Sequence, residues 1–197
     1  DYVSPLGNIS DVQLGVPVAI NIENGIAAMA LAQLGGVSNE DIKTGMASFR
    51  GVDRRFDFKI KTDKVVYLSD YAHHPEEIKQ SILSMRALYE GKRLTGIFQP
   101  HLYTRTRDFY QEFADSLSLL DEVILTDIYP ARELPIEGVS SQLIYDNLRP
   151  DIDKTLCKKE EVIDILKKKE IEVLMTLGAG DIENYAPQIC EILNERC

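Results

Sequence analysis

From about residue 64 onward, short apolar segments of strand length alternate with longer segments of helical periodicity. In the helical segments apolar residues recur every three or four positions, as Ile78, Ile82 and Met85 do. Such alternation is typical of a mostly parallel sheet with helices on both faces, so the pattern predicts an α/β fold. The expected strands are 55–61, 64–69, 94–99, 123–127, 155–157 and 171–177, and the expected helices are 75–89, 106–119, 142–148, 160–169 and 181–194.

The first fifty residues follow a different pattern. Apolar spacing predicts a helix over 21–34, and Ser38 is placed to cap a second helix that runs to about Phe49. The break at 50–52 predicts a boundary between a domain of residues 1–51 and a domain of residues 52–197. The stretch before Pro17 is irregular and starts without a cap or turn, so we expect the chain to be a piece of a longer protein.

Composition excludes several classes of function. The chain has 197 residues and a formal net charge of −10, which disfavours general nucleic-acid binding. No apolar run approaches the roughly 20 residues that a membrane-spanning helix needs, so no membrane partner is expected. The three cysteines form no C-x-x-C pair, and they predict reduced thiols and a cytoplasmic location.

The charge is distributed unevenly along the chain. The net formal charge is −4 over residues 1–49, +5 over residues 50–107 and −11 over residues 108–197. A basic segment inside an acidic chain suits a small anion such as phosphate better than a long polyanion. Chance clustering of charges on a solvated surface is an equally good interpretation of the charge pattern.

All three histidines, His73, His74 and His101, come just after predicted strands. Open α/β sheets bind ligands beyond the carboxyl ends of their strands, so the two loops would face one crevice if the two strands are neighbours. The alternative is that these histidines are ordinary helix-entry and turn residues. The same loops also hold a carboxylate, a phenol and two guanidiniums, which together suit an anionic substrate: Asp70, Tyr71, Arg105 and Arg107.

Other chemistries have less support. Adjacent histidines generally point apart and no H-x-x-x-H spacing exists, so we expect no metal ion bound by protein ligands alone. No G-x-S-x-G turn is present, and Cys190 lies inside a predicted amphipathic helix, which disfavours a hydrolase. No G-x-x-x-x-G-K-[ST] motif is present either, so any nucleoside triphosphate must be gripped elsewhere.

Two further segments have both a functional and a structural interpretation. Arg54 and Arg55 lie at the predicted domain junction, where they either reach a phosphate held by another domain or are simply exposed charges. The turn around Gly178 and Gly180 exposes N–H groups before a helix, which suits either an anion or close packing, with Asp181 as the helix cap.

Four segments resemble the Mur ligases in order along the chain. They are FRGVDRRF (49–56), DYAHHP (70–75), FQPHLYTRTRD (98–108) and GAGDI (178–182). The resemblance covers residues 17 to 192 and implies a Rossmann-like C-terminal domain, preceded by the helical end of the family's central ATPase domain. The family's N-terminal UDP-binding domain and its P-loop would be missing, and we expect this piece to be inactive by itself.

The resemblance also implies a reaction. Mur ligases join a carboxylic acid to an amine: the carboxylate is phosphorylated at the expense of ATP, and the amine then attacks the acyl phosphate. The implied small-molecule partners are UDP-N-acetylmuramate and L-alanine. The implied cofactors are ATP and Mg²⁺, held mainly by the missing N-terminal and central domains of the same chain.

By position, the resemblance assigns roles to individual residues. Asn21 and Asn24 match an H-N-x-x-N element near adenine, and Arg55 matches an arginine that reaches the ATP phosphates. Asp70 matches an aspartate near the ribose hydroxyls. The positions that line the incoming amino acid and the acyl centre are Tyr71, His73, His101 and Arg105. Among these residues, Arg55, His101 and Arg105 are the expected catalytic groups.

The sequence departs from the family pattern at two positions. Ile20 stands where the adenine element often has histidine, and Leu102 stands where many relatives have arginine. Arg105 is therefore the best candidate for anchoring the substrate carboxylate. Two alternatives remain open: a Mur-type ligase that recycles a murein tripeptide, and a stand-alone α/β module that binds an anionic metabolite.

Overall fold

The computed structural model describes residues 1–16 and 18–196, so Pro17 and Cys197 lie outside the described residues. The chain divides into two compact units, Asp1–Val52 and Asp53–Cys197. No helix in the described ranges has the length and apolar character that crossing a membrane requires.

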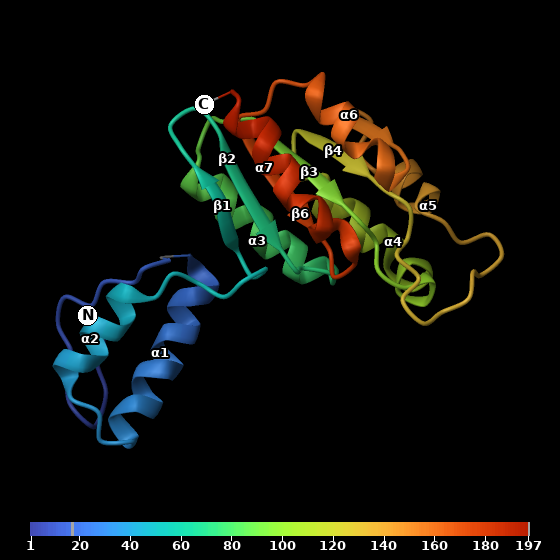
Figure 1. Ribbon diagram of the computed structural model, residues 1–197. Helices are drawn as coiled ribbons and strands as arrows, with labels where there is room; N and C mark the ends of the chain where they lie inside the picture. Colours follow the sequence, from blue (N-terminus) through green and yellow to red (C-terminus); the bar gives the residue numbers. More distant parts are fainter. Residues whose placement is uncertain (17, 197) are drawn as a thin grey trace. The chain divides into compact units, whose positions relative to one another are not determined.

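The first unit contains two helices, α1 (Ala19–Leu34) and α2 (Asn39–Ser48), drawn in blue in Figure 1. Both predicted helices are confirmed. Ser38 caps α2 as expected, because its side chain accepts a hydrogen bond from the N–H of Asp41 at 3.1 Å. The segment before α1 is folded as well: Tyr2 and Ile9 pair as an antiparallel bridge and are buried in a small core.

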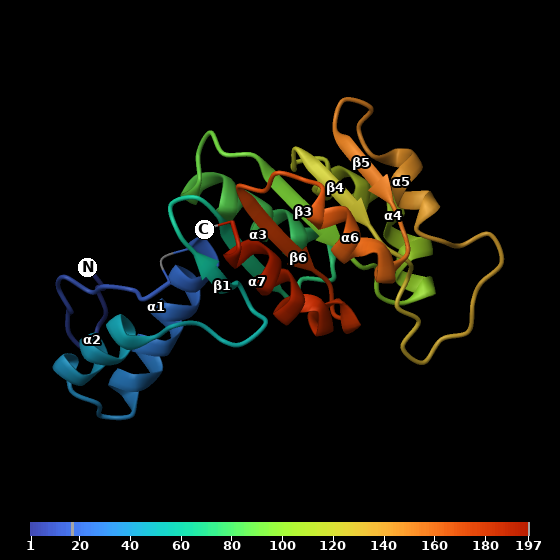
Figure 2. The ribbon, with the colours of Figure 1, turned by 45° about the horizontal axis from the view of Figure 1, so that its top comes forward.

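The second unit is built on a six-stranded sheet of order β1-β2-β6-β3-β4-β5 among the described residues. The strand β1 runs antiparallel to β2, and the other neighbours are parallel, which confirms the predicted α/β class (Figure 2). The strands are β1 (Asp57–Lys61), β2 (Val66–Asp70), β3 (Leu94–Phe98), β4 (Glu122–Leu125), β5 (Asp153–Leu156) and β6 (Val173–Leu177).

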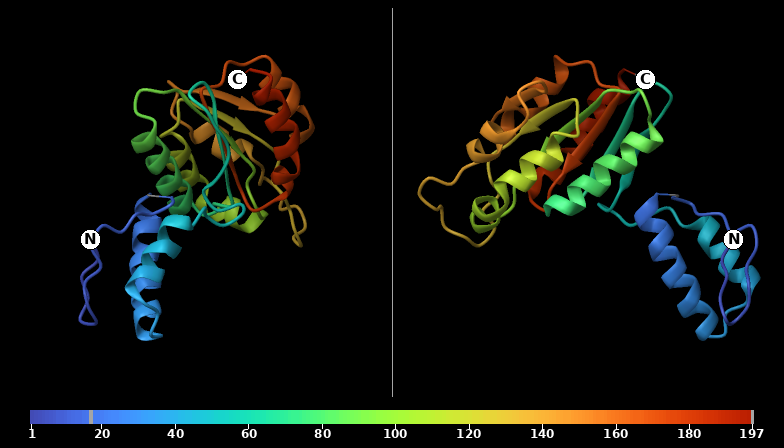
Figure 3. Two further views of the ribbon diagram at one scale, coloured as in Figure 1. Left: turned by 60° about the vertical axis from the view of Figure 1, so that its left-hand side comes forward. Right: turned by 180° about the vertical axis from the view of Figure 1, so that it is seen from behind.

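Helices cover both faces of this sheet (Figures 1 and 3). On β3, Phe98 packs against Phe113 of α4 with ring centroids 5.2 Å apart, whereas its neighbour Ile97 joins the core formed with α6 and α7. Successive strand residues thus face opposite helix layers. The helices are α3 (Pro75–Leu88), α4 (Tyr103–Leu117), α5 (Gln142–Asn147), α6 (Val162–Lys167) and α7 (Ala186–Asn194).

Besides the helix expected over 160–169, which is divided into a 3₁₀ segment, Lys159–Glu161, and α6, two helices differ from the sequence prediction. The helix expected from residue 106 already begins at Tyr103 and has a kink at Phe109, where φ is −128° and ψ is 17°. The helix expected over 181–194 is split into a 3₁₀ segment, Asp181–Tyr185, and α7. Pro187 explains this second difference, because proline has no N–H for a continuous helix and suits the first turn of a new one.

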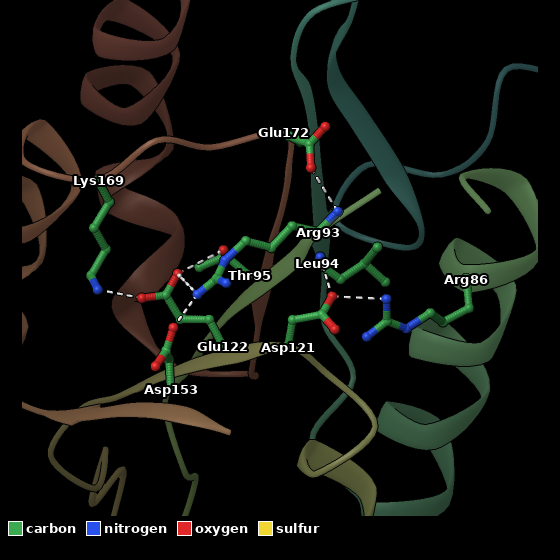
Figure 4. Close-up of polar contacts among 9 residues, drawn as sticks. All are labelled: Arg86, Arg93, Leu94, Thr95, Asp121, Glu122, Asp153, Lys169 and Glu172. Atoms are coloured by element: carbon green, nitrogen blue, oxygen red, sulfur yellow. Dashed lines mark hydrogen bonds and ion pairs between the residues drawn. The ribbon is translucent and has the colours of Figure 1, made fainter. Parts of the chain in front are cut away.

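A buried carboxylate on β4 contacts β3 and, through Arg93, is linked to β5 at the amino end of the sheet (Figure 4). Glu122 of β4 is 3% exposed, accepts a hydrogen bond from the Thr95 hydroxyl at 3.0 Å, and pairs with Lys169 and Arg93. Arg93 also pairs with Asp153 of β5. This network lies at the end of the sheet opposite the loops that carry the histidines, and its partners are protein groups.

Candidate functional site

The two histidine loops meet at the carboxyl edge of the sheet, but not because their strands are neighbours. The strand β6 lies between β2 and β3. The two strands that precede the histidine loops are therefore not neighbours, which sequence analysis had required for the loops to meet. His73 and His101 nevertheless approach each other, with ring centroids 6.1 Å apart. The loops therefore converge across the end of β6, so that three strand ends rather than two bring these side chains together.

The glycine turn after β6 allows the loops after β3 and β4 to approach it closely. Gly178 has φ of +135°, and a Cβ atom there would lie 2.6 Å from the carbonyl oxygen of Gln99. At Gly180 an added Cβ would lie 2.2 Å from Gln99 Oε1 and 2.8 Å from Tyr129 Cβ. Both positions require glycine because neighbouring backbone and side chains approach so closely. This geometry favours close packing as the function of the turn.

The polar groups of that turn are used within the protein. The side-chain amide of Gln99 donates to Asp181 Oδ1 at 2.8 Å and accepts from the N–H of Ile182 at 2.9 Å. Asp181 also forms an ion pair with Lys159. Asp181 thus links two side chains, and the Gln99 amide oxygen satisfies the N–H of Ile182.

Four rings form a continuous row along the carboxyl edge, which we call the ring row: Tyr71, His73, His101 and Tyr129. The ring centroids of Tyr71 and His73 are 5.4 Å apart, and those of His101 and Tyr129 are 5.7 Å apart in a stacked arrangement. Two cations border the row: the Arg54 guanidinium lies 4.8 Å from the centre of the Tyr71 ring, and Arg105 lies beside His101. The ring faces can stack on a flat group, and the guanidiniums of Arg54 and Arg105 beside the row can bind an anionic one.

The loop after β2 directs its two histidines to different places. His73 Nδ1 lies 3.0 Å from the carbonyl oxygen of Tyr71, which orients its ring into the row. The carboxylate of Glu77 accepts from the N–H groups of His73 at 3.0 Å and His74 at 3.2 Å, and this fixes the start of α3. His74 instead packs against Phe109, with centroids 5.2 Å apart. The expectation that adjacent histidines point apart is therefore confirmed.

His101 and Arg105 lie together at the start of α4. Nη1 of Arg105 is 3.3 Å from Nδ1 of His101. Burial lowers the pKa of His101 below its usual 6.5, and the positive charge of Arg105 lowers it further. At neutral pH His101 is a neutral imidazole that can accept a proton, next to a guanidinium that can bind a carboxylate.

Asp70, the last residue of β2, is held by the protein itself. Its Oδ2 accepts from the Ser81 hydroxyl at 2.7 Å and its Oδ1 accepts from the N–H of Ala72 at 3.3 Å. Burial raises the pKa of this carboxyl, and the Ser81 hydrogen bond opposes the rise. These contacts fix the direction in which the chain leaves β2 and enters the histidine loop.

Arg54 and Arg55 are placed differently. Arg54 has φ of +61°, its carbonyl accepts from the N–H of Tyr71 at 2.7 Å, and its guanidinium donates to the carbonyl of Gly180 at 3.3 Å. Its Nε is buried without a hydrogen-bond partner in the described part of the chain. Arg55 is exposed, and no described residue pairs with its guanidinium, which leaves it available to a ligand.

The two asparagines belong to the first unit. Asn21 is half-buried on α1 and donates to the carbonyl of Val16 at 3.3 Å, whereas Asn24 is exposed one turn later. Residues three apart on a helix share a face. The side chain of Ile20 lies outside the described atoms. Leu102, the other departure from the family pattern, adopts φ of +74° directly before α4.

Sequence analysis missed two residues of this site. Tyr129 follows β4, so the rule that used strand ends for the histidines also points to it, and its ring stacks on His101. Glu133 accepts from the N–H of Thr104 at 3.0 Å. No local pattern indicates that contact, because the two residues are 29 positions apart. No group of three or more potential metal ligands is found in the described ranges.

Comparison with known proteins identifies the family. The family described as "Mur ligase, glutamate ligase domain" matches residues 54–182. A UDP-N-acetylmuramate–L-alanine ligase of Phocaeicola vulgatus is 78% identical over 196 residues, which is 100% of this chain and 43% of the relative. The chain thus spans about two fifths of the length of the curated relatives it matches.

Solved structures agree with this match. A crystal structure of the UDP-N-acetylmuramate–alanine ligase MurC from Thermotoga maritima superposes with a TM-score of 0.78 at 27% identity, covering 94% of this chain and 40% of that one. A murein peptide ligase from Psychrobacter arcticus shares the fold, with a TM-score of 0.65 at 19% identity over 92% of this chain and 38% of that one. The chain belongs to the Mur ligase family and contains its glutamate ligase domain.

Proposed function

We propose that the chain is the C-terminal part of a ligase that joins UDP-N-acetylmuramate to L-alanine in peptidoglycan synthesis. In the proposed reaction the carboxylate receives the γ-phosphoryl group of ATP, and the amine of alanine attacks the resulting acyl phosphate. The amide forms as phosphate leaves, and ADP is the other product. Support comes from the Phocaeicola vulgatus relative of that name, at 78% identity.

The observation that carries the proposal is the ring row, with Arg54 stacked at one end and Arg105 beside His101. Cationic and imidazole groups from separate loops meet there at the carboxyl edge of a parallel sheet, where α/β proteins bind ligands. An amide ligase needs such groups, because it must hold the anionic carboxylate of an amino acid while it removes a proton from the ammonium group.

On the amino-acid side, we assign Arg105 to the carboxylate of alanine, since a guanidinium can bind it through two hydrogen bonds. His101 is assigned to take the proton from the ammonium group, because its lowered pKa keeps it neutral. Tyr71 and His73 would line the pocket for the small side chain. A water-excluding arrangement matters here, because water also consumes an acyl phosphate.

On the nucleotide side, Arg55 is the residue whose surroundings fit best, because its guanidinium is exposed and has no partner among the described residues. Asn24 is similarly exposed, and with Asn21 it would offer amide groups to adenine. Asp70 is proposed near the ribose, although its carboxylate already holds Ser81. We place the Mg²⁺ site, which offsets phosphate charge during phosphoryl transfer, in the remainder of the protein.

The test is phosphate release from ATP by the full-length protein. We expect release only when UDP-N-acetylmuramate and an amino acid are both present, with L-alanine preferred. Arg105→Met should abolish the preference, whereas Arg107→Met, which removes an exposed guanidinium paired with Asp108, should not. The 197-residue chain should be inactive by itself, because it contains no P-loop lysine.

Other outcomes would select other functions. Equal release with a tripeptide in place of alanine would favour a murein peptide ligase. No release with any amino acid, together with a gene that lacks G-x-x-x-x-G-K-[ST] upstream of Asp1, would favour an anion-binding module. The proposal includes the missing domains of the same chain as partners. It also includes a cytoplasmic location, because the thiols of Cys157 and Cys190 are free.

A further inference from the structure

The long connection between β4 and α5 contacts the site at two points, Tyr129 and Glu133. This segment, residues 126–141, extends away from the sheet in Figures 1 and 2. Within it, the N–H of Glu133 donates to the carbonyl of Pro130 at 2.9 Å, forming a turn. The Glu133 carboxylate then reaches Thr104 at the start of α4: Oε2 accepts from the Thr104 N–H at 3.0 Å and Oε1 from its hydroxyl at 2.5 Å.

Helix α4 has no cap of its own. Its N-cap residue is Leu102, which has an apolar side chain and an unusual φ of +74°. The first N–H groups of a helix need acceptors, and a carboxylate there is also favoured by the helix dipole. Glu133 supplies this acceptor from outside the helix, and its hydrogen bonds with Thr104 lower the pKa of its carboxyl, which keeps it ionised.

The capped segment is short and is divided from the rest of α4 by a kink. The kink at Phe109 interrupts the helix one and a half turns after Thr104. Arg105 lies within this segment, and its guanidinium contacts His101 at 3.3 Å. The position of Arg105 therefore depends less on the packed body of α4 and more on what holds the first turn.

The same connection holds the other side of His101. The N–H of Leu102 donates to the carbonyl of Tyr129 at 3.0 Å, and the N–H of Tyr129 donates to the carbonyl of Pro100 at 2.8 Å. The Tyr129 ring stacks on His101. One segment thus fixes the imidazole through Tyr129 and the following helical turn through Glu133.

We propose that Glu133 is a positioning residue for amino-acid binding: by capping α4 it holds Arg105 beside His101, where the guanidinium meets the carboxylate of the incoming amino acid. This inference rests on the proposed function. The inference goes beyond the proposed function, because it assigns part of the binding of the amino acid to a side chain that does not touch the substrate.

The experiment compares Glu133→Ala with Glu137→Ala in the full-length protein, with phosphate release measured at varied L-alanine and varied ATP. Glu137 is exposed in the same connection and has no partner among the described residues, so it matches the lost charge without the contact. We expect Glu133→Ala to raise the KM for L-alanine about fivefold to tenfold, the loss typical of a helix cap, and to leave the KM for ATP within twofold. Glu137→Ala should change neither KM.

Variants of Thr104 test the same contact without changing Glu133, and they decide the question if Glu133→Ala does not fold. Thr104→Ser keeps both donors and should behave as the unmodified protein, whereas Thr104→Val keeps the N–H and loses the hydroxyl, and should give an intermediate KM for L-alanine. The proposal is overturned if Glu133→Ala leaves this KM within twofold, or if it raises the KM values for L-alanine and ATP by the same factor.

Amide hydrogen exchange separates this inference from the proposed function. In the same purified proteins, exchange at Thr104 and Arg105 should accelerate at least fivefold in Glu133→Ala and stay unchanged in Glu137→Ala. If the unmodified protein releases no phosphate with alanine, the proposed function fails. The exchange result then still decides whether Glu133 holds the Arg105 turn, and unchanged exchange would overturn it.

Discussion

His73 and His101 lie 6.1 Å apart between ring centroids, although the strands that precede them are separated by β6. The distance between neighbouring strands is about 4.8 Å, so loops that follow β2 and β3 must both lean over the end of β6 to meet. The turn after β6 carries glycine at the two points where the loops after β3 and β4 approach it most closely, at Gln99 and Tyr129. The position of the His101 loop therefore depends on the absence of side chains at Gly178 and Gly180.

Replacing Gly178 should destabilise the protein and separate the two loops. An alanine Cβ would lie 2.6 Å from the Gln99 carbonyl oxygen, at a φ of +135° that alanine rarely adopts. We expect Gly178→Ala to lower the free energy of unfolding by about 3 kcal/mol, from the clash and the backbone strain together. Urea unfolding of the purified protein measures this.

Gly138→Ala is the matched control for that substitution. Gly138 also has a positive φ, +76°, but nothing lies within 4 Å of an added Cβ. Its replacement should cost about 1 kcal/mol, from the left-handed backbone alone. Equal losses for the two variants would show that the close approach to Gln99 is unimportant.

Arg105→Met should raise the pKa of His101. Burial is the main cause of the lowered pKa and the Arg105 charge is the next, so removing that charge moves the pKa upward while it stays below 6.5. An NMR titration of the imidazole protons gives the shift directly. Arg107→Met is the control, because Arg107 is exposed and paired with Asp108. A pKa of His101 that does not change in Arg105→Met would show that the two side chains do not interact electrostatically.

The lowered pKa of His101 also determines in which direction this residue makes stability depend on pH. Between the pKa of folded His101 and 6.5, the unfolded chain binds more protons on this residue than the folded protein does. Stability from His101 is therefore complete above pH 6.5 and declines as the pH falls through 6.5 toward the folded pKa. In Arg105→Met this decline should be smaller, as measured by urea unfolding at several pH values.

Arg55→Ala should impair turnover without affecting folding. Arg55 is exposed and has no partner among the described residues, so the free energy of unfolding should change by less than about 0.5 kcal/mol. If it binds the ATP phosphates, kcat/KM for ATP should fall at least about tenfold, as expected for a lost charged hydrogen bond. Steady-state kinetics of the full-length protein test this, and full activity would remove the phosphate role.

Arg54→Ala provides the contrast. Its guanidinium covers the Tyr71 ring and donates to the Gly180 carbonyl, so its loss should destabilise the protein by about 1 to 2 kcal/mol. A variant of Arg54 that folds with unchanged stability would show that these contacts contribute little.

Local sequence patterns predicted much of this structure, and non-local contacts explain the rest. The Ser38 cap, the strand segments and the position of all three histidines after strands follow from spacing and from residue type. The order of the strands does not, since nothing near His73 or His101 indicates that β6 inserts between their strands. The early start of α4 was also missed, because the Glu133 carboxylate that caps it is 29 residues away.

In the buried Glu122 network, replacing Lys169 should cost more stability than replacing Glu122. The Glu122 side chain is 4% exposed, whereas that of Lys169 is 28% exposed. Lys169→Met leaves a buried carboxylate with the more distant Arg93, at 3.6 Å, and the Thr95 hydroxyl. We expect it to lower the free energy of unfolding by about 3 kcal/mol. Glu122→Gln should cost about 1 kcal/mol, because the freed cations can turn toward water and the amide can still accept from Thr95.

The double variant tests this explanation. If the cost in Lys169→Met comes from an uncompensated buried charge, adding Glu122→Gln should recover part of the lost stability, which urea unfolding would detect. Lys167→Met is the control: Lys167 pairs with Asp164 at 3.5 Å on the surface, and its loss should change stability by less than about 0.5 kcal/mol. A double variant less stable than Lys169→Met would show that the remaining ion pair of Glu122 with Arg93 outweighs the cost of burying the charge.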